Sequence, residues 1–114
     1  MTLNEKDKND VMSIAAGEGY ISIVNDMIKN GANAYNRALS SAARTGHIAI
    51  VQLMLDKGAT DLNKALVFAA ENGHRDIVEL LLEYGANDYD DAKRQARVRN
   101  YHDIVELINS YQYA

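Results

Sequence analysis

Two of the three histidines, His47 and His74, stand 27 residues apart in the same local context, after a glycine and three residues before an Ile-Val pair. A histidine in a zinc site needs further ligands, commonly a second histidine or a carboxylate at helical spacing. Neither histidine has such a residue three or four positions after it, and His102 is shifted by one because Tyr101 takes the equivalent position. We therefore expect a structural role for the histidines and no metal site.

The remaining polar residues match no catalytic or cofactor-binding pattern. Asp88, Asp90 and Asp91 lack the spacing of an EF-hand and its glycine at the sixth position, so we expect a solvated turn and a helix cap. The glycines form no phosphate-binding motif, no serine stands in a G-x-S-x-G segment, and cysteine is absent. The sequence therefore predicts that the protein is not an enzyme and carries no cofactor.

The spacing of the glycines indicates which elements position these residues. Glycines at positions 19, 46 and 73, and again at 31, 58 and 85, recur every 27 residues. Residues 63–89 match residues 36–62 at more than half of their positions. A fixed period in this range indicates a stack of similar supersecondary units.

One unit, residues 63–89, is predicted to hold two helices. Asn63 is the expected N-cap of a short helix over 64–72, which ends at Gly73. The equivalent cap positions of the other units are Asn9, Asn36 and Asp90. A second, longer helix is expected over 74–84. Helices of this length are marginal alone, so each unit must stack on its neighbours, and the predicted fold class is all-α.

The segment ALVFAAENGHRDIVELLLEYGAN, residues 65–87, resembles the ankyrin repeat. The shared pattern runs through Ala-Ala, a Gly-His turn, Ile/Val-Val, Leu-Leu and a closing Gly-Ala-Asn, and the resemblance covers about residues 9–111. It implies that the turn histidine hydrogen-bonds the neighbouring turn. The compact units are also similar to those in ankyrin proteins of large DNA viruses that infect amoebae.

The chain departs from the ankyrin pattern in two ways. Proline is absent, so the Thr-Pro-Leu-His motif of the family is missing, and the unit is shorter than the usual repeat of about 33 residues. The missing residues belong to the loop that forms a β-hairpin finger in the family. We therefore expect an ankyrin-like solenoid of four helix-turn-helix repeats with the β-hairpin fingers reduced or absent.

The chain is divided as a polar N-terminal lead-in, residues 1–8, and a single repeat domain, residues 9–114. The units are 9–35 as N-terminal cap, 36–62, 63–89, and 90–114 as C-terminal cap. In the last unit Lys93 and Arg97 stand where the central units have leucine and alanine. Because the outer face of a terminal repeat meets water, we expect both side chains to be solvated and the protein to be complete.

The resemblance implies that the short helices and the turns after them line a concave, partner-binding face. The predicted partner-binding residues are Ser41, Arg44, Thr45, Phe68, Glu71, Asn72 and Arg99. Phe68 is the most informative of them because the equivalent residues, Ser41 and Gln95, are polar. Two interpretations stay open: Phe68 is an exposed binding anchor, or it packs locally in the core.

A group of basic residues lies near the end of the chain: Lys93, Arg94, Arg97 and Arg99. It fits either a solvated helix face or a site for an acidic partner. Nucleic acid is disfavoured, because no aromatic residues alternate with these charges and the chain has a net charge of −4.

The predicted function is a non-enzymatic protein–protein interaction scaffold that binds an unidentified protein partner through the concave face. The alternative is a structural spacer or a self-associating repeat element without a dedicated partner. The composition, with 47% hydrophobic residues and no long apolar run, predicts a soluble, intracellular protein without a membrane segment. We expect a monomer located in the cytoplasm, that of the host if the protein is viral.

Overall fold

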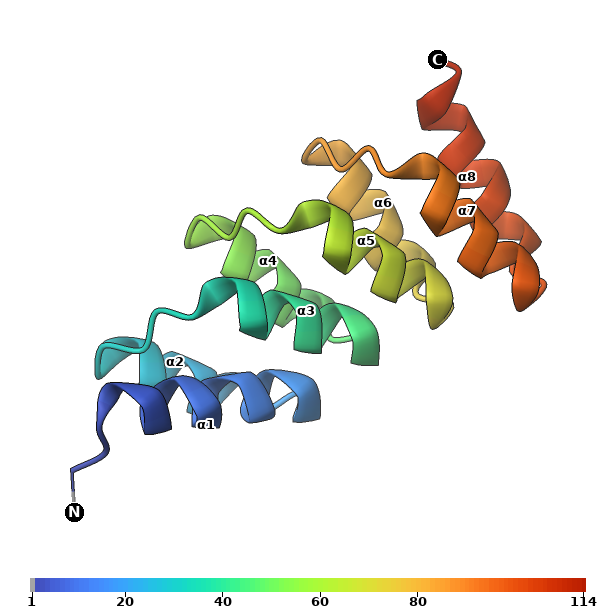
Figure 1. The fold of residues 1–114 in the computed structure, drawn as a ribbon. Coiled ribbons are helices and arrows are strands. Elements are labelled where there is room, and N and C mark those ends of the chain that lie inside the picture. Colours follow the sequence, from blue (N-terminus) through green and yellow to red (C-terminus); the bar gives the residue numbers. More distant parts are fainter. Residues whose placement is uncertain (1) are drawn as a thin grey trace.

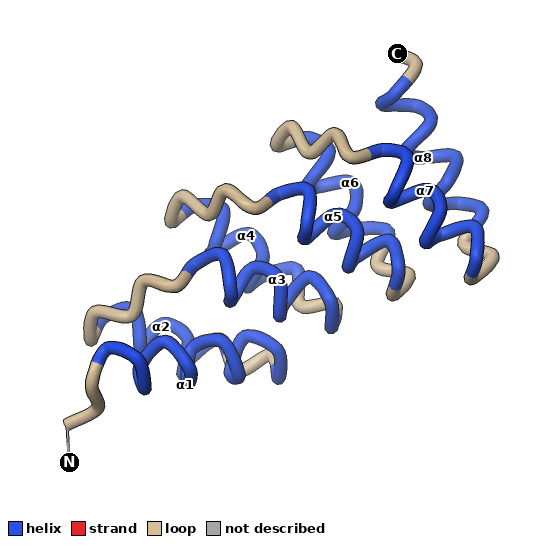
Figure 2. Tube along the Cα trace, in the orientation of Figure 1, coloured by secondary structure: helices blue, strands red, loops and turns tan. Residues whose placement is uncertain are grey.

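The computed structural model describes residues 2–114, and this part of the chain contains eight α-helices and no strand. The helices are α1 (Glu5–Glu18), α2 (Ile21–Lys29), α3 (Tyr35–Thr45), α4 (Ile48–Asp56), α5 (Leu62–Glu71), α6 (Arg75–Glu83), α7 (Tyr89–Val98) and α8 (His102–Gln112). They follow one another as four pairs joined by loops (Figure 1, Figure 2). The predicted all-α stack of four helix-turn-helix repeats, with the β-hairpin fingers reduced or absent, is therefore confirmed.

The four helix pairs stack into an elongated body of 51 × 23 × 18 Å. The first helices of the pairs, α1, α3, α5 and α7, form one row in which each packs on the next (Figure 1). Each second helix packs on the first helix of its own pair, whereas α4 and α6 make only a slight contact with each other. The row of first helices is thus the more tightly packed side, as expected for the concave side of a curved stack.

Small side chains permit this close packing of the first helices. The alanine pairs Ala42-Ala43 and Ala69-Ala70 are fully buried between neighbouring units. Larger side chains that are almost fully buried fill the space between the two rows: Leu39, Ile50, Leu66, Ile77, Leu81 and Ile104. Each such leucine or isoleucine contributes roughly 1.5–3 kcal/mol to the hydrophobic stabilisation.

The ring of a histidine or tyrosine side chain from the next unit covers the turn between the two helices of a pair. Gly46 ends α3 with φ +93°, and a Cβ at this position would lie only 2.7 Å from Cε1 of His74. Nε2 of His74 donates a hydrogen bond to the carbonyl oxygen of Arg44 at 3.0 Å. The structural role predicted for this histidine is confirmed. The other ring–glycine contacts are His47 on Gly19 and Tyr101 on Gly73.

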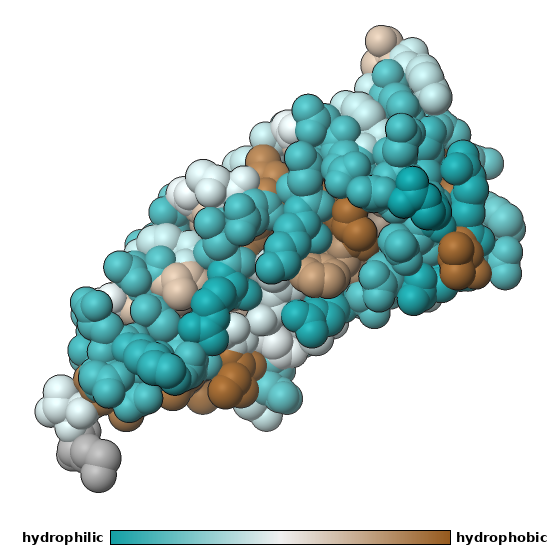
Figure 3. Space-filling view, in the orientation of Figure 1, coloured by the Kyte–Doolittle hydropathy of each residue, from teal (hydrophilic) through white to brown (hydrophobic). Residues whose placement is uncertain are grey.

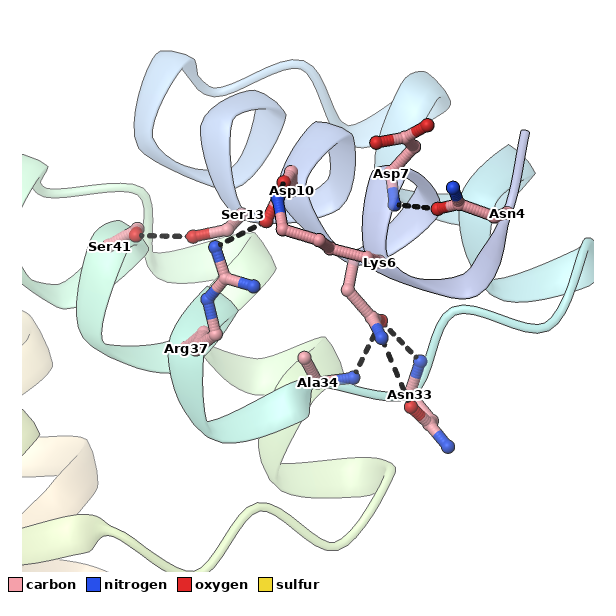
Figure 4. A network of polar contacts seen from close by, with 10 residues as sticks. Asn4, Lys6, Asp7, Asp10, Ser13, Asn33, Ala34, Arg37 and Ser41 are labelled. Atoms are coloured by element: carbon pink, nitrogen blue, oxygen red, sulfur yellow. Dashed lines mark hydrogen bonds and ion pairs between the residues drawn. The ribbon is translucent and has the colours of Figure 1, made fainter.

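The asparagines predicted as N-caps have another role, so that prediction was wrong. Asn63 is the second residue of α5, and its Oδ1 accepts hydrogen bonds from the backbone N–H groups of Asn87 and Asp88, at 2.7 and 2.9 Å. These two residues lead directly into α7, so the asparagine of one unit holds the entrance to the first helix of the next. Asn9 and Asn36 make the same pairs of bonds to the entrances of α3 and α5. Figure 4 shows the N–H groups of Asn33 and Ala34 in the first of these sites.

Helix boundaries differ from the prediction in two further respects. The first helix begins at Glu5, capped by the side chain of Asn4, which accepts a hydrogen bond from the N–H of Asp7. It therefore extends into the segment that was expected to be a polar lead-in before the repeat domain. In addition, α5 has 10 residues and α6 has 9, so the first helix of the unit is not the shorter one. The reason is that His74 and Tyr84 cap α6 and do not belong to it, whereas α5 starts before Asn63.

Lys93 is buried, contrary to the prediction that it faces water. Its side chain is covered by α8, which is two residues longer than α6. Nζ of Lys93 donates to Oδ1 of Asn109 at 3.1 Å and lies 5.2 Å from the ring centre of Tyr113. The final turn of α8 and the residue that caps it thus give the ammonium polar and aromatic partners. Arg97, by contrast, is exposed.

Candidate functional site

The predicted partner-binding residues all lie along one side of the row of first helices. They occupy the C-terminal halves of α3 and α5 and the residues directly after α5 and α7. We call this surface the inner face; it comprises Ser41, Arg44, Thr45, Phe68, Glu71, Asn72 and Arg99. The helices that carry it are held in register by the buried alanine pairs, so its side chains stand on a rigid base.

Phe68 is half-buried, whereas the alanines that follow it are fully buried. The guanidinium of Arg44, which belongs to the preceding unit, lies 4.9 Å from the centre of the Phe68 ring. A cation–π contact of this kind at an exposed site contributes about 0.5–1 kcal/mol. The pair therefore forms a partly open aromatic–cationic surface across the boundary between two units.

A second contact between units joins the inner-face residues Glu71 and Arg99. Their carboxylate and guanidinium lie 3.6 Å apart, and the side chains are 36% and 40% exposed. Ion pairs as exposed as this one contribute only about 0–1 kcal/mol to stability. Both charges thus remain accessible to a partner. Because they have opposite signs, each partly neutralises the other.

The three remaining inner-face residues use their polar groups within the fold. Ser41 shares a hydrogen bond of 3.1 Å with Ser13 of α1, and the hydroxyl of Thr45 donates to the Ser41 carbonyl at 2.9 Å. The amide of Asn72 donates to the carbonyl of Phe68 at 2.8 Å and closes the end of α5. These residues shape the surface more than they offer unpaired groups.

Two shallow hollows adjoin the Arg44–Phe68 pair. One, of about 280 Å³, lies between α1 and α3; its lining residues are Ser13, Ile14, Gly17, Glu18, Ser41, Arg44 and Thr45. The other, of about 200 Å³, extends from α1 across α3 to α5; its lining residues are Ser13, Arg37, Ser40, Ser41, Arg44, Lys64 and Phe68. Arg44 is common to both hollows.

Sequence reasoning missed Arg37 and Lys64, which line the second hollow. Their signal was present, because the two residues occupy the same position in successive units and both are basic there, whereas Asp10 and Asp91 hold this position in the terminal units. The prediction considered only the end of the first helix and the turn after it. The structure places the beginning of α3 and of α5 on the same surface.

The basic group near the end of the chain is not a single patch. Lys93 is buried beside Asn109, Arg94 pairs with Asp91, and Arg99 pairs with Glu71. Only Arg97 of this group is exposed without an ion pair among residues 2–114. The arrangement offers no concentrated positive surface for nucleic acid at this end.

A larger hollow, of about 580 Å³, lies in the other row, where α4 and α6 diverge. Ile48 and Leu80 provide its apolar part, and charged residues surround them, namely Arg75, Asp76, Glu79 and Glu83. Arg75 pairs with Glu79 at 3.2 Å. Partial burial and the nearby carboxylates of Glu83 and Glu79 raise the pKa of Tyr111. This hollow is acidic and open, and it lies on the row opposite the inner face.

No group of three histidine, cysteine or acidic side chains within residues 2–114 has the arrangement of a metal site. In the same part of the chain, each helix is too short or too polar to cross a bilayer.

On the side drawn in Figure 3, hydrophobic side chains form separate patches in a mostly hydrophilic surface. The inner face is therefore equipped for contacts that combine charge, hydrogen bonds and one aromatic ring.

The chain matches a model of a known protein family. Residues 12–92 match a family model described as "Ankyrin repeats (3 copies)". No curated protein matches the chain.

Proposed function

Because the chain belongs to the ankyrin-repeat family, whose repeats are generally protein–protein interaction modules and not enzymes, we propose that it binds a protein partner through the inner face. The observation that carries this proposal is the half-buried Phe68 with the Arg44 guanidinium over its ring. Aromatic and arginine side chains are the residue types most enriched among binding hot spots.

The mechanism in this proposal is complementarity to a surface that is already ordered. The buried alanine pairs and the hydrogen bonds between units hold α3 and α5 in place before a partner arrives. A rigid surface loses little conformational freedom on binding, so more of the contact energy appears as affinity. The protein acts as a monomer in the cytoplasm, that of the host cell if the resemblance to viral proteins reflects its origin.

A site-specific photocrosslinker tests the location of the partner. We expect a crosslinker placed at Asn72 on the inner face to capture a defined protein, and one placed at Glu83 on the opposite row to capture it far less. The identified partner is then titrated against Phe68→Ala and against Tyr84→Ala, since Tyr84 is also a partly exposed aromatic residue but lies after α6.

Loss of binding in Phe68→Ala alone, with an unchanged melting temperature, supports the inner face. Equal binding by wild type and Phe68→Ala contradicts the proposal and moves the partner to another surface. Sedimentation that shows only self-association, with no captured protein, favours the alternative of a self-associating repeat element.

A further inference from the structure

The middle of the row of first helices carries a charge opposite in sign to the net charge of the protein. The chain has a net charge of −4, yet α3 contains two arginines, Arg37 and Arg44, and no carboxylate. The second helices are strongly acidic; their carboxylates are Asp26, Asp56, Asp76, Glu79, Glu83, Asp103 and Glu106, against the cations Lys29 and Arg75. Positive charge is thus concentrated at α3 and the start of α5.

An internal ion pair shows how this surface binds a carboxylate. Oδ1 of Asp10 lies 3.0 Å from Nη2 of Arg37, one repeat away, and its other oxygen lies 2.7 Å from Nζ of Lys6 (Figure 4). Both cations donate hydrogen bonds to the carboxylate and lower the pKa of Asp10.

One repeat further along, the corresponding carboxylate is missing. Lys64 stands where Arg37 stands in the preceding unit, but its neighbour in the position of Asp10 is Arg37 itself. Two cations therefore follow one another along the face, and Lys64 forms no ion pair with any residue from Thr2 to Ala114. An external carboxylate placed between them would relieve this repulsion.

The hollow between these cations has the size and polarity to accept such a group. Its volume of about 200 Å³ is below the ~300–1,000 Å³ typical of sites for drug-sized ligands, so a single side chain fits better than a cofactor. The Ser13–Ser41 hydroxyl pair contributes to its lining. The hydroxyl of Ser40, which also lines it, is buried without a hydrogen-bond partner in residues 2–114. Unpaired buried polar groups disfavour an apolar occupant.

We propose that the hollow lined by Arg37, Arg44 and Lys64 binds an aspartate or glutamate side chain from an acidic segment of the protein partner. The proposal rests on the proposed function of the inner face and defines the chemistry of its partner. The guanidinium of Arg44 lies over the Phe68 ring. The acidic residue of the partner would therefore contact Arg44 while an adjacent apolar group of the partner contacts the ring of Phe68.

A peptide fits this surface better than a nucleic acid does. Tight binding of nucleic acid needs many phosphate contacts from a continuous positive surface, whereas the carboxylates of Asp10, Glu18 and Glu71 flank this hollow on the same row. A peptide can present its carboxylate to the hollow and neutral residues to the flanks.

The test is a titration of the folded, isotopically labelled protein with oligo-glutamate, monitored by NMR. We expect saturable shifts of backbone amides in α3 and at the start of α5, and no such shifts with oligo-glutamine. Lys64→Glu should weaken the binding by at least about tenfold, and Arg37→Gln should weaken it in the same direction. Lys57→Glu is the matched control, because it makes the same charge change at an exposed residue after α4, and we expect it to change the affinity less than about threefold.

Equal weakening by Lys64→Glu and Lys57→Glu, or no saturable shifts at millimolar peptide, overturns the proposal. Stronger binding of oligothymidylate at the same amides also overturns it and indicates a phosphate ligand. The proposed function is tested separately: if a peptide without acidic residues, selected from a display library, binds and loses its affinity in Phe68→Ala, the inner face is a binding surface but the acidic partner is wrong.

Discussion

At the scale of single residues, a few side chains join units that are otherwise held by apolar packing. The Oδ1 of Asn63 accepts two backbone hydrogen bonds from residues 24 and 25 positions later, and the same side chain donates to Oδ1 of Asn87. Asp10 links α1 to α3 through Arg37. Such contacts add little apolar burial, but they specify the spacing between units.

We predict that Asn63→Ala destabilises the protein by about 1–2 kcal/mol, because two backbone N–H groups lose their acceptor. Asn63→Asp should cost less, since a carboxylate oxygen can accept both bonds. The measurement is the free energy of unfolding in urea. Asp90→Ala is the control: Asp90 has the equivalent position in the fourth unit, and its side chain accepts no such pair of hydrogen bonds from a residue between Thr2 and Ala114. A similar loss in both alanine variants would refute the proposed role of the asparagine.

The ion pair of Asp10 predicts a pH dependence with a definite sign. Because the folded state lowers the pKa of this carboxyl, its contribution to stability is present above the unfolded-state pKa and is lost as the pH falls through the folded-state pKa. We expect Asp10→Asn to lower the melting temperature slightly at neutral pH and not in acid. Asp26→Asn, on the exposed part of α2, should show no such difference. A deficit in Asp10→Asn that persists unchanged in acid would contradict the electrostatic origin.

At the scale of the elements, the turn inside each helix pair combines a backbone requirement with a steric one. Gly46 has φ +93° and lies under the His74 ring, whereas Gly58, with φ +97°, has open space around the position of a Cβ. Both positions favour glycine for their backbone conformation, but only the first is also a packing site. Replacement of the glycine is therefore tolerated less well in the turn between the helices of a pair than in the loop between pairs.

We predict that Gly46→Ala costs more stability than Gly58→Ala. The second variant should lose about 1 kcal/mol, mainly from the left-handed backbone conformation. The first should lose roughly 1–3 kcal/mol more, because the His74 ring must move and its hydrogen bond to Arg44 is weakened. Thermal and urea unfolding of the two variants measure the difference. Equal losses would show that the ring moves away without cost.

At the scale of the whole molecule, stability comes from stacking, and the two ends differ. The C-terminal end is covered by the longer α8, which buries Lys93 beside Asn109. At the N-terminal end, Ile23 is 40% exposed, although its equivalents Ile77 and Ile104 are at most 1% exposed. A preceding unit covers each internal isoleucine, and no described residue covers Ile23 in this way.

We predict that Ile77→Ala destabilises the protein by about 2–5 kcal/mol, while Ile23→Ala costs less than about 1 kcal/mol. The two substitutions remove the same atoms from equivalent positions, so the comparison isolates the effect of the neighbouring unit. Urea unfolding followed by circular dichroism measures both. Similar losses would mean that stacking contributes little at this position, in conflict with the packing seen here.

Local features of the chain were sufficient to predict the eight helices, their pairing into four units and the positions of the turns, and the resemblance added the expectation that the fingers are reduced or absent. A positive φ at glycine, an apolar period and a fixed repeat length depend on residues close in sequence, so they can be recognised without a structure. The Gly19, Gly46 and Gly73 turns belong to this class. The resemblance carried by Gly46-His47 and Gly73-His74 supplied the family.

The contacts between units were decided only by the tertiary structure. The partners of Asn63, the burial of Lys93, the Arg44–Phe68 contact and the nearness of Arg37 to Lys64 depend on how far one unit is displaced and rotated against the next. A sequence repeat states which positions are equivalent, but it does not state which positions of neighbouring units touch. That relation is set by the packing of side chains across the whole stack, and the candidate binding surface is formed at those boundaries.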